Sequence, residues 1–105
     1  MINAEIKDIV ERIRAAISPK KIYLFGSFAR GDMGKYSDYD FYVVVANGAG
    51  NVLDLRQEAY CSLLGMKRAR GADILVSDEA TFTKRKTEST IEREVTKEGV
   101  LLYEC

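Results

Sequence analysis

The stretch that decides the fold is Tyr39–Ala46, which reads YDFYVVVA. After Asp40 it contains only aromatic and β-branched residues until the final alanine, which makes it the strongest strand signal in the chain. Because this run is apolar on both faces, neither face can be turned to water, and such strands lie inside a sheet. We therefore predict that Tyr39–Ala46 is a central strand.

Two other segments supply neighbours for this strand. Lys21–Phe25 (KIYLF) and Ala72–Val76 (ADILV) are short, apolar and rich in β-prone residues. Val100–Tyr103 is predicted to pack as a tail or as one further short strand. The sequence therefore predicts a small sheet.

Apolar residues at helical spacing predict helices around these strands. Pro19 ends the first helix at Ser18, because the residue before a proline disfavours the helical conformation. Asn51 is suited to cap the next helix, and Ser77, which two acidic residues follow, is suited to start another. The predicted helices cover residues 3–17 and 52–66, a single turn at 27–30, and two short segments that end at Glu98.

The order of these elements is helix, strand, strand, helix, strand, helix, helix. This order predicts an α/β (α+β) fold in which a small mixed β-sheet is flanked by helices. A length of 105 residues without repeats or linkers predicts a single domain over residues 1–105.

The charge balance and the absence of histidine limit the function. The chain has 16 basic and 16 acidic residues, so long-range attraction to nucleic acid or a membrane is not expected. Low net charge also leaves little repulsion between molecules, so a homo-oligomer remains open. With no histidine in the sequence, catalysis has to use carboxylates, hydroxyls, lysine or arginine.

The two cysteines and the N-terminus indicate where the protein works. Cys61 and Cys105 lie far apart and form no CxxC pair, so a zinc or redox site is not expected. Cys61 falls on an apolar helical stripe and is interpreted as a small buried hydrophobe. The N-terminus is not typical of a signal peptide, and no apolar run approaches about 20 residues. We expect a reduced, cytoplasmic protein.

The chemistry is predicted at the beginning of the central strand. Gly26 lets the chain turn sharply after Phe25, and Ser27 offers a hydroxyl and an N–H group to a phosphate at the start of a helical turn. Asp38 and Asp40 are two residues apart, and strand alternation would place both carboxylates on one face. Two close carboxylates repel each other unless a cation lies between them, and Mg²⁺ prefers carboxylates together with substrate phosphates. The sequence therefore predicts a site for a nucleoside triphosphate and Mg²⁺.

Asp73 is the candidate for a third carboxylate. It opens the strand ADILV, which can pair with the central strand and so bring Asp73 beside Asp38 and Asp40. There it would take part in binding metal and would deprotonate or orient an attacking hydroxyl.

Each of these residues also has a simpler interpretation. Asp38 and Asp40 could form a turn and a helix cap, Gly26 and Ser27 a plain turn, and Asp73 a cap or an edge charge. Arg30 could hold a substrate phosphate, or pair with Asp32 or Asp38.

Several other polar residues near the site also have two interpretations. A base could stack on Tyr36, Tyr39 or Tyr42, although Tyr42 also suits the core. Residues 84–86 (KRK) are either a solvated helix face or a docking patch.

The pattern GSFARG followed by SDYD resembles the nucleotidyltransferase superfamily with the DNA polymerase β-type fold, and more narrowly its minimal nucleotidyltransferase (MNT) domains. Gly26, Ser27 and Arg30 match the family's GSxARG element, whereas Asp38 and Asp40 match its SDxD element. Asp73 falls where the family has its third carboxylate. In aspartate phosphatases, by contrast, a DxD pair follows the strand, whereas here it precedes one.

The resemblance implies a nucleotidyltransferase fold and an activity. Small members of the family commonly form a toxin–antitoxin pair with a helical HEPN protein, and some transfer AMP to a tyrosine of that partner. We therefore expect Mg²⁺-dependent transfer of a nucleoside monophosphate, with AMP favoured, from ATP to a hydroxyl of a partner protein that supplies the acceptor surface. The alternative is a non-catalytic, nucleotide-binding antitoxin that neutralises its partner by contact.

Overall fold

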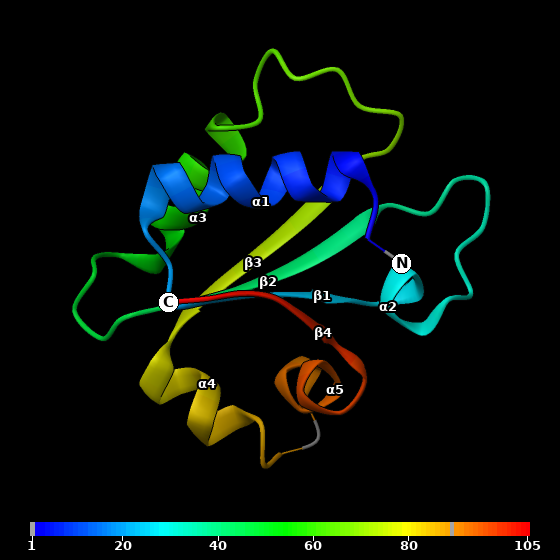
Figure 1. Ribbon diagram of the computed structural model, residues 1–105. Coiled ribbons are helices and arrows are strands. Elements are labelled where there is room, and N and C mark those ends of the chain that lie inside the picture. Colours follow the sequence, from blue (N-terminus) through cyan, green and yellow to red (C-terminus); the bar gives the residue numbers. More distant parts are fainter. Residues whose placement is uncertain (1, 89) are drawn as a thin grey trace.

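A four-stranded mixed sheet with the order β3–β2–β1–β4 runs through the middle of the computed structural model, which describes residues 2–88 and 90–105 (Figure 1). β2 is parallel to β3, whereas β1 is antiparallel to both β2 and β4. The predicted α/β class and the central place of the strand YDFYVVVA are therefore confirmed. The strands are β1 (Lys21–Phe25), β2 (Tyr39–Val45), β3 (Ala72–Asp78) and β4 (Val100–Glu104).

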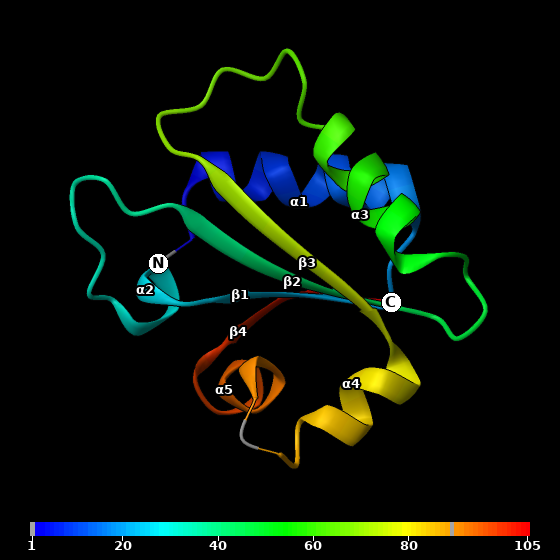
Figure 2. The same cartoon turned by 180° about the vertical axis from the view of Figure 1, so that it is seen from behind.

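Helices cover both faces of this sheet. α1 (Ala4–Ile17) and α3 (Val52–Cys61) lie on one face, whereas α4 (Glu79–Arg85) and α5 (Ile91–Glu98) lie on the other (Figures 1 and 2). α2 (Ser27–Arg30) is a single turn at the end of β1. Since both faces are covered, β2 has to be apolar on both sides, and each of its residues except Asp40 is buried.

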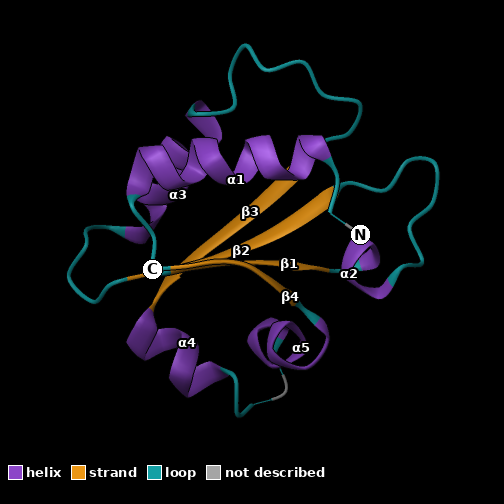
Figure 3. Cartoon of the chain, in the orientation of Figure 1, coloured by secondary structure: helices purple, strands orange, loops and turns teal. Residues whose placement is uncertain are grey.

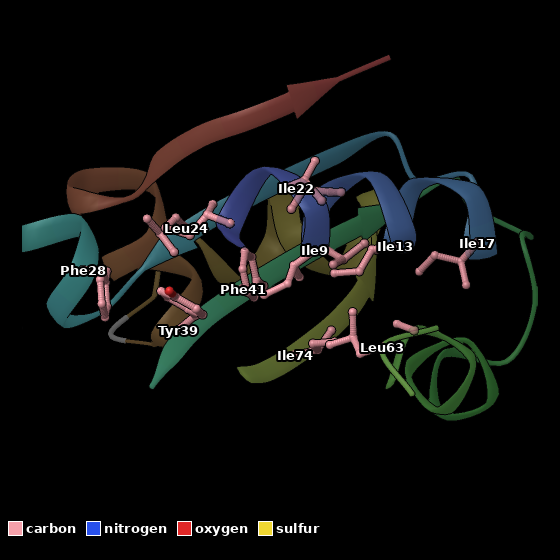
Figure 4. Close-up of a cluster of buried hydrophobic side chains, with 14 of the residues drawn as sticks. Ile9, Ile13, Ile17, Ile22, Leu24, Phe28, Tyr39, Phe41, Leu63 and Ile74 are labelled. Carbon is pink, nitrogen blue, oxygen red and sulfur yellow. The ribbon is translucent and has the colours of Figure 1, made fainter. Parts of the chain in front are cut away.

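The larger of two hydrophobic cores lies between the sheet and the pair α1 and α3 (Figure 4). The helical stripe predicted for the first helix is buried there, facing alternate residues of the strands. Figure 4 labels several of these side chains, among them Ile9, Ile13, Ile22, Phe41 and Ile74. This core is the rigid support on which the beginnings of β2 and β3 rest.

The predicted helix boundaries hold where a local cap determines them. Asn3 accepts a hydrogen bond from the Ile6 N–H, and Asn51 accepts from the N–H groups at the start of α3. Ser18 follows α1 in the left-handed conformation, immediately before Pro19.

The helix start predicted at Ser77 is wrong by one residue. Ser77 lies inside β3 and is buried, and its Oγ is 2.8 Å from the Tyr42 hydroxyl. Asp78 is the residue that caps α4, because its carboxylate accepts a hydrogen bond from the Thr81 N–H. The sequence offered two adjacent capping residues, and packing against Tyr42 decided between them.

The helix predicted over residues 52–66 ends at Cys61, and turns continue the chain to Gly65. Cys61 is exposed, so its interpretation as a buried hydrophobe is wrong. Within the described residues neither Cys61 nor Cys105 forms a disulfide.

Among the residues that the structure describes, no helix has the length and apolar character needed to cross a bilayer.

A buried polar network joins the second face of the sheet to α4 and α5. The Tyr42 hydroxyl donates to Glu92 at 2.6 Å, and Arg85 Nε donates to the other oxygen of Glu92 at 3.0 Å. Burial, together with the bond to Glu92, raises the pKa of Tyr42. All three residues of the predicted basic face, Lys84, Arg85 and Lys86, are exposed, and Arg85 also pairs with Glu92 and so helps to hold this layer.

Candidate active site

The beginnings of β2 and β3 bring two of the three predicted carboxylates together. Asp40 of β2 and Asp73 of β3 are directly opposite in the parallel register. Residues at paired positions of parallel strands point to the same face of a sheet, so both carboxylates face the side that α4 and α5 cover. The predicted position of Asp73 beside Asp40 is therefore confirmed, whereas its catalytic role stays a prediction.

Asp38 reaches the site by a different route from the one predicted. It precedes β2 and is exposed, so strand alternation does not set the direction of its side chain. Its carboxylate lies against Gly71, where a Cβ atom would stand 2.9 Å from Oδ1 of Asp38. The Tyr39 N–H donates to the Gly71 carbonyl at 3.0 Å and holds the two segments together. Figure 3 shows that the loops before β2 and β3 lie at the same end of the sheet.

Gly26 forms a cradle for the Asp40 carboxylate. Phe25 pairs with Asp40 in the antiparallel register, so the chain turns at Gly26 next to that side chain. Gly26 has φ +73° and ψ −152°, a conformation available almost only to glycine. A Cβ atom on Gly26 would overlap Oδ2 of Asp40. The glycine predicted from the GS pattern is therefore required both for the turn and for the space that Asp40 occupies.

The electrostatics of Asp40 reflect this crowding. Burial raises the pKa of Asp40 to about 6, and repulsion first from Asp73 and then from Asp38 adds to the effect. Arg30 opposes the shift, whereas Glu94 of α5 adds slightly to it. Negative charge is thus concentrated at this point, and a bound cation would relieve it.

The raised pKa predicts how stability depends on pH. Because the folded protein binds the Asp40 proton more tightly than the unfolded chain does, ionisation of Asp40 destabilises the fold above about pH 6, and this penalty disappears below about pH 4. Asp40→Asn removes the penalty, so we expect it to stabilise the metal-free protein at pH 7.5 by about 1 kcal/mol after allowance for solvent screening. Thermal unfolding of both proteins in EDTA at pH 7.5 and pH 4 measures the difference. A gain in stability that is equal at the two pH values would contradict the assigned cause.

Two roles were predicted for Arg30, binding a substrate phosphate or pairing with a nearby aspartate, and the structure shows such an ion pair. Its Nε is 3.1 Å from Asp32, and its Nη1 is 3.7 Å from Glu94 and 4.0 Å from Glu98. Arg30 therefore pairs with Asp32, as one interpretation had it, and not with Asp38. These ion pairs tie α2 to α5, and a phosphate would have to compete with them to recruit the guanidinium.

The residues fit Mg²⁺ only in combination with a substrate. Among the described residues, no group of three acidic, cysteine or histidine side chains is close enough to hold one ion. Mg²⁺, however, is usually held by one or two carboxylates, with phosphates and water completing the shell. Three carboxylates provide these hard oxygen ligands. Asp40 lies against Gly26, Asp38 lies against Gly71, and Asp73 is paired with Asp40 across the two strands. The donor set thus suits a magnesium–nucleotide complex better than a free ion.

Of the three tyrosines near the site, Tyr39 differs from the prediction, whereas Tyr42 takes the core position that was its alternative interpretation. Tyr39 and Tyr42 are both 1% exposed and belong to the two cores, so neither can stack on a base. Tyr36 is 85% exposed and keeps that interpretation. A cavity of about 410 Å³ lies farther along β3, where Leu75, Ser77 and Asp78 line it together with residues of α3 and α4, and none of the predicted site residues belongs to its lining.

Several known proteins are similar to this chain in sequence and in fold. The family described as "Nucleotidyltransferase domain" matches residues 4–102. The chain is 35% identical over 100 residues to "Putative protein adenylyltransferase MJ0604" of Methanocaldococcus jannaschii. This alignment covers 93% of this chain and 94% of that protein.

Two crystal structures extend the comparison. A "putative nucleotidyltransferase" from Sulfolobus solfataricus superimposes with a TM-score of 0.64 at 28% identity, over 93% of this chain and 76% of that one. A toxin-antitoxin with AMP-PNP superimposes with a TM-score of 0.56 at 21% identity, over 94% of this chain and 73% of that one, a likeness that establishes the fold alone. The family match over residues 4–102 and the Methanocaldococcus relative establish more than the fold: this chain belongs to the nucleotidyltransferase domain family.

Proposed function

We propose that the protein transfers AMP from ATP, with Mg²⁺, to a hydroxyl of a partner protein. The observation that carries the proposal is the convergence of the Gly26–Ser27 turn with Asp38, Asp40 and Asp73 at one end of the sheet. The name of the Methanocaldococcus relative, a protein adenylyltransferase, supports AMP as the group and a protein as the acceptor.

Each residue of the site has a role in this proposal. The turn at Gly26 and Ser27 holds the β- and γ-phosphates, because the glycine lets the backbone come close to them. Asp38, Asp40 and Asp73 would hold Mg²⁺ together with the oxygens of the triphosphate, which complete its shell. When bound, Mg²⁺ supplies positive charge that offsets the charge of the triphosphate and of the crowded carboxylates.

The transfer is a displacement at the α-phosphorus. The acceptor oxygen forms a bond to the α-phosphorus. At the same time the bond between the α-phosphorus and the oxygen that joins it to the β-phosphorus breaks, and pyrophosphate leaves. The hydroxyl proton passes to the Asp73 carboxylate and then to water.

The partner in this proposal is a HEPN-type helical protein, so that the domain acts in the cytoplasm as the antitoxin of a toxin–antitoxin pair. The resemblance to minimal nucleotidyltransferases supports this choice. So does the fold that the chain shares with a toxin-antitoxin solved with AMP-PNP, which also favours an adenine nucleotide.

A second candidate function is a nucleotide-binding antitoxin that neutralises its partner by contact without catalysis. One observation favours it: within the described part of the chain, no three side chains form a complete metal site. The two functions differ in whether AMP is added to the partner, which would raise the partner's mass.

Calorimetric titration with AMP-PNP and MgCl₂ tests the nucleotide site. We expect wild type to bind and Asp38→Asn/Asp40→Asn to bind at least about tenfold more weakly, because the metal ligands are lost. Equal affinity in the two proteins would refute the assigned site, and no binding by wild type would refute nucleotide binding altogether.

The matched control is Asp8→Asn/Asp54→Asn, which removes the same two charges from exposed positions in α1 and α3. Its affinity should equal that of wild type, because these residues lie outside the site. Weakened binding by the control would show that the loss in the test variant does not report on the site.

Intact-mass measurement of the partner after incubation with ATP and Mg²⁺ separates the two functions. Transfer adds one AMP, and Asp73→Asn should abolish this gain while it keeps most of the nucleotide affinity. A wild-type protein that binds nucleotide and partner but leaves the partner's mass unchanged supports the non-catalytic function.

A further inference from the structure

Arg70 makes an unusual set of contacts next to the site. Its Nη1 group donates to the carbonyl oxygens of Gly34 and Ser37, both at 2.9 Å, and to that of Lys35 at 3.4 Å. Its guanidinium also lies over the ring of Phe28, 4.9 Å from the centroid. The side chain is half-buried, so these contacts are partly shielded from water.

These contacts connect three segments that the site needs and that are far apart in sequence. Phe28 follows Ser27 in α2, Ser37 immediately precedes Asp38, and Arg70 itself precedes Gly71 and Asp73. One planar guanidinium therefore spans the phosphate turn, the loop that carries Asp38, and the beginning of β3. That loop contains two glycines, Gly31 and Gly34. The Gly34 N–H donates a hydrogen bond to the Ser37 hydroxyl at 2.8 Å, which links the two halves of the loop.

The backbone that carries Arg70 is itself anchored to α1. Oε2 of Glu5 accepts a hydrogen bond from the Ala69 N–H at 2.7 Å, and Oε1 accepts one from the Tyr39 hydroxyl at 2.5 Å. The bond from Tyr39, followed by the bond from Ala69, lowers the pKa of Glu5, because both bonds stabilise its carboxylate form. Arg70 thus lies between a segment that Glu5 anchors to α1 and the loop 31–38, which has no helix or strand of its own.

We propose that Arg70 is a positioning residue that holds the loop 31–38 against α2 and β3 and so sets the distance between Ser27, Asp38 and Asp73. The proposal rests on the proposed function only in placing a nucleotide at these three residues. A site whose ligands come from separate segments binds tightly only when those segments are held in place beforehand. The competing explanation is that Arg70 merely adds positive charge, which attracts the nucleotide from any nearby position.

Three variants separate position from charge. Arg70→Gln removes both the charge and the contacts. Arg70→Lys keeps the charge but loses the planar group over Phe28 and the fork that reaches the loop. Arg68→Gln is the matched control, because Arg68 is an exposed arginine in the same segment, and among the described residues no hydrogen bond of its side chain is found.

Hydrogen exchange measured by mass spectrometry gives a readout that does not depend on the nucleotide. We expect deuterium uptake by residues 31–38 to be at least about tenfold faster in Arg70→Gln than in wild type or Arg68→Gln, with uptake in β1 unchanged. Equal uptake in all proteins would overturn the proposal even if the nucleotide site is correct.

Titration with AMP-PNP and MgCl₂ gives the second readout. We expect an affinity about 10- to 100-fold lower for Arg70→Gln and nearly as low for Arg70→Lys, with Arg68→Gln close to wild type. Full affinity in Arg70→Lys would assign Arg70 a charge role and overturn the positioning role. If wild type itself fails to bind, the proposed function is wrong, and the exchange measurement alone decides the role of Arg70 in ordering the loop.

Discussion

Gly26→Ala is expected to lower the free energy of unfolding by about 3 kcal/mol and to abolish nucleotide binding. The alanine would have to adopt φ +73° and ψ −152°, which costs about 1–3 kcal/mol for a residue with a side chain. Its Cβ would also overlap Oδ2 of Asp40, so the carboxylate has to leave the cradle that the turn provides. Urea unfolding measures the first effect, and calorimetric titration with AMP-PNP and MgCl₂ measures the second.

Two other glycines separate backbone strain from the collision. Gly48 has φ +80°, and none of the described atoms lies within 4 Å of its Cβ position, so Gly48→Ala should cost only about 1–2 kcal/mol and leave binding unchanged. Gly71→Ala has no positive φ, but its Cβ displaces the exposed Asp38 carboxylate, so it should weaken binding with little loss of stability. A Gly26→Ala protein that binds nucleotide as wild type does would contradict the cradle.

Phe41→Ala is expected to destabilise the protein by about 3–5 kcal/mol, which is a large share of the stability of a domain of this size. Phe41 is fully buried in β2, between Asp40 and Tyr42, and packs in the core that α1 and α3 cover. Truncation leaves a cavity behind the strand that presents Asp40. Chemical unfolding should show a lower midpoint with little change in slope.

Leu64→Ala is the control for this truncation, because Leu64 is 76% exposed in the turns that follow α3. It should change stability by less than about 0.5 kcal/mol. A loss for Phe41→Ala as small as that for Leu64→Ala would mean that β2 is not packed as the structure describes.

Local patterns predicted most of the secondary structure. The run after Asp40 is apolar on both faces, which is sufficient to predict a covered central strand. The cap at Asn51 depends on its own side chain and the next turn of helix, so its prediction holds. The cap after β3 did not follow from the sequence, because Ser77 and Asp78 are equally suited to it until Tyr42 takes up Ser77.

Besides the two helix boundaries at Ser77 and Met66, the predictions that failed concern the burial of single side chains. Tyr39 looked available for stacking, yet its ring is buried against Phe28 and its hydroxyl donates to Glu5. Cys61 looked buried, yet α3 ends at that residue and exposes it. Burial depends on which elements meet, and periodicity along one segment does not contain that information.

By itself, the sequence determined the chemistry that this protein can use. It contains no histidine, it has a glycine where a strand must turn, and Asp38, Asp40 and Asp73 stand at the beginnings of two predicted strands. Only the tertiary structure decided how these groups meet. The parallel register sets Asp40 opposite Asp73, and the Asp38 carboxylate lies against Gly71. Arg70 connects the loop 31–38 to α2 and β3, across more than 30 residues of sequence. The physical reason is that side-chain type and spacing act over one turn or one strand, whereas the distances within a site are set by the packing of segments far apart in the chain.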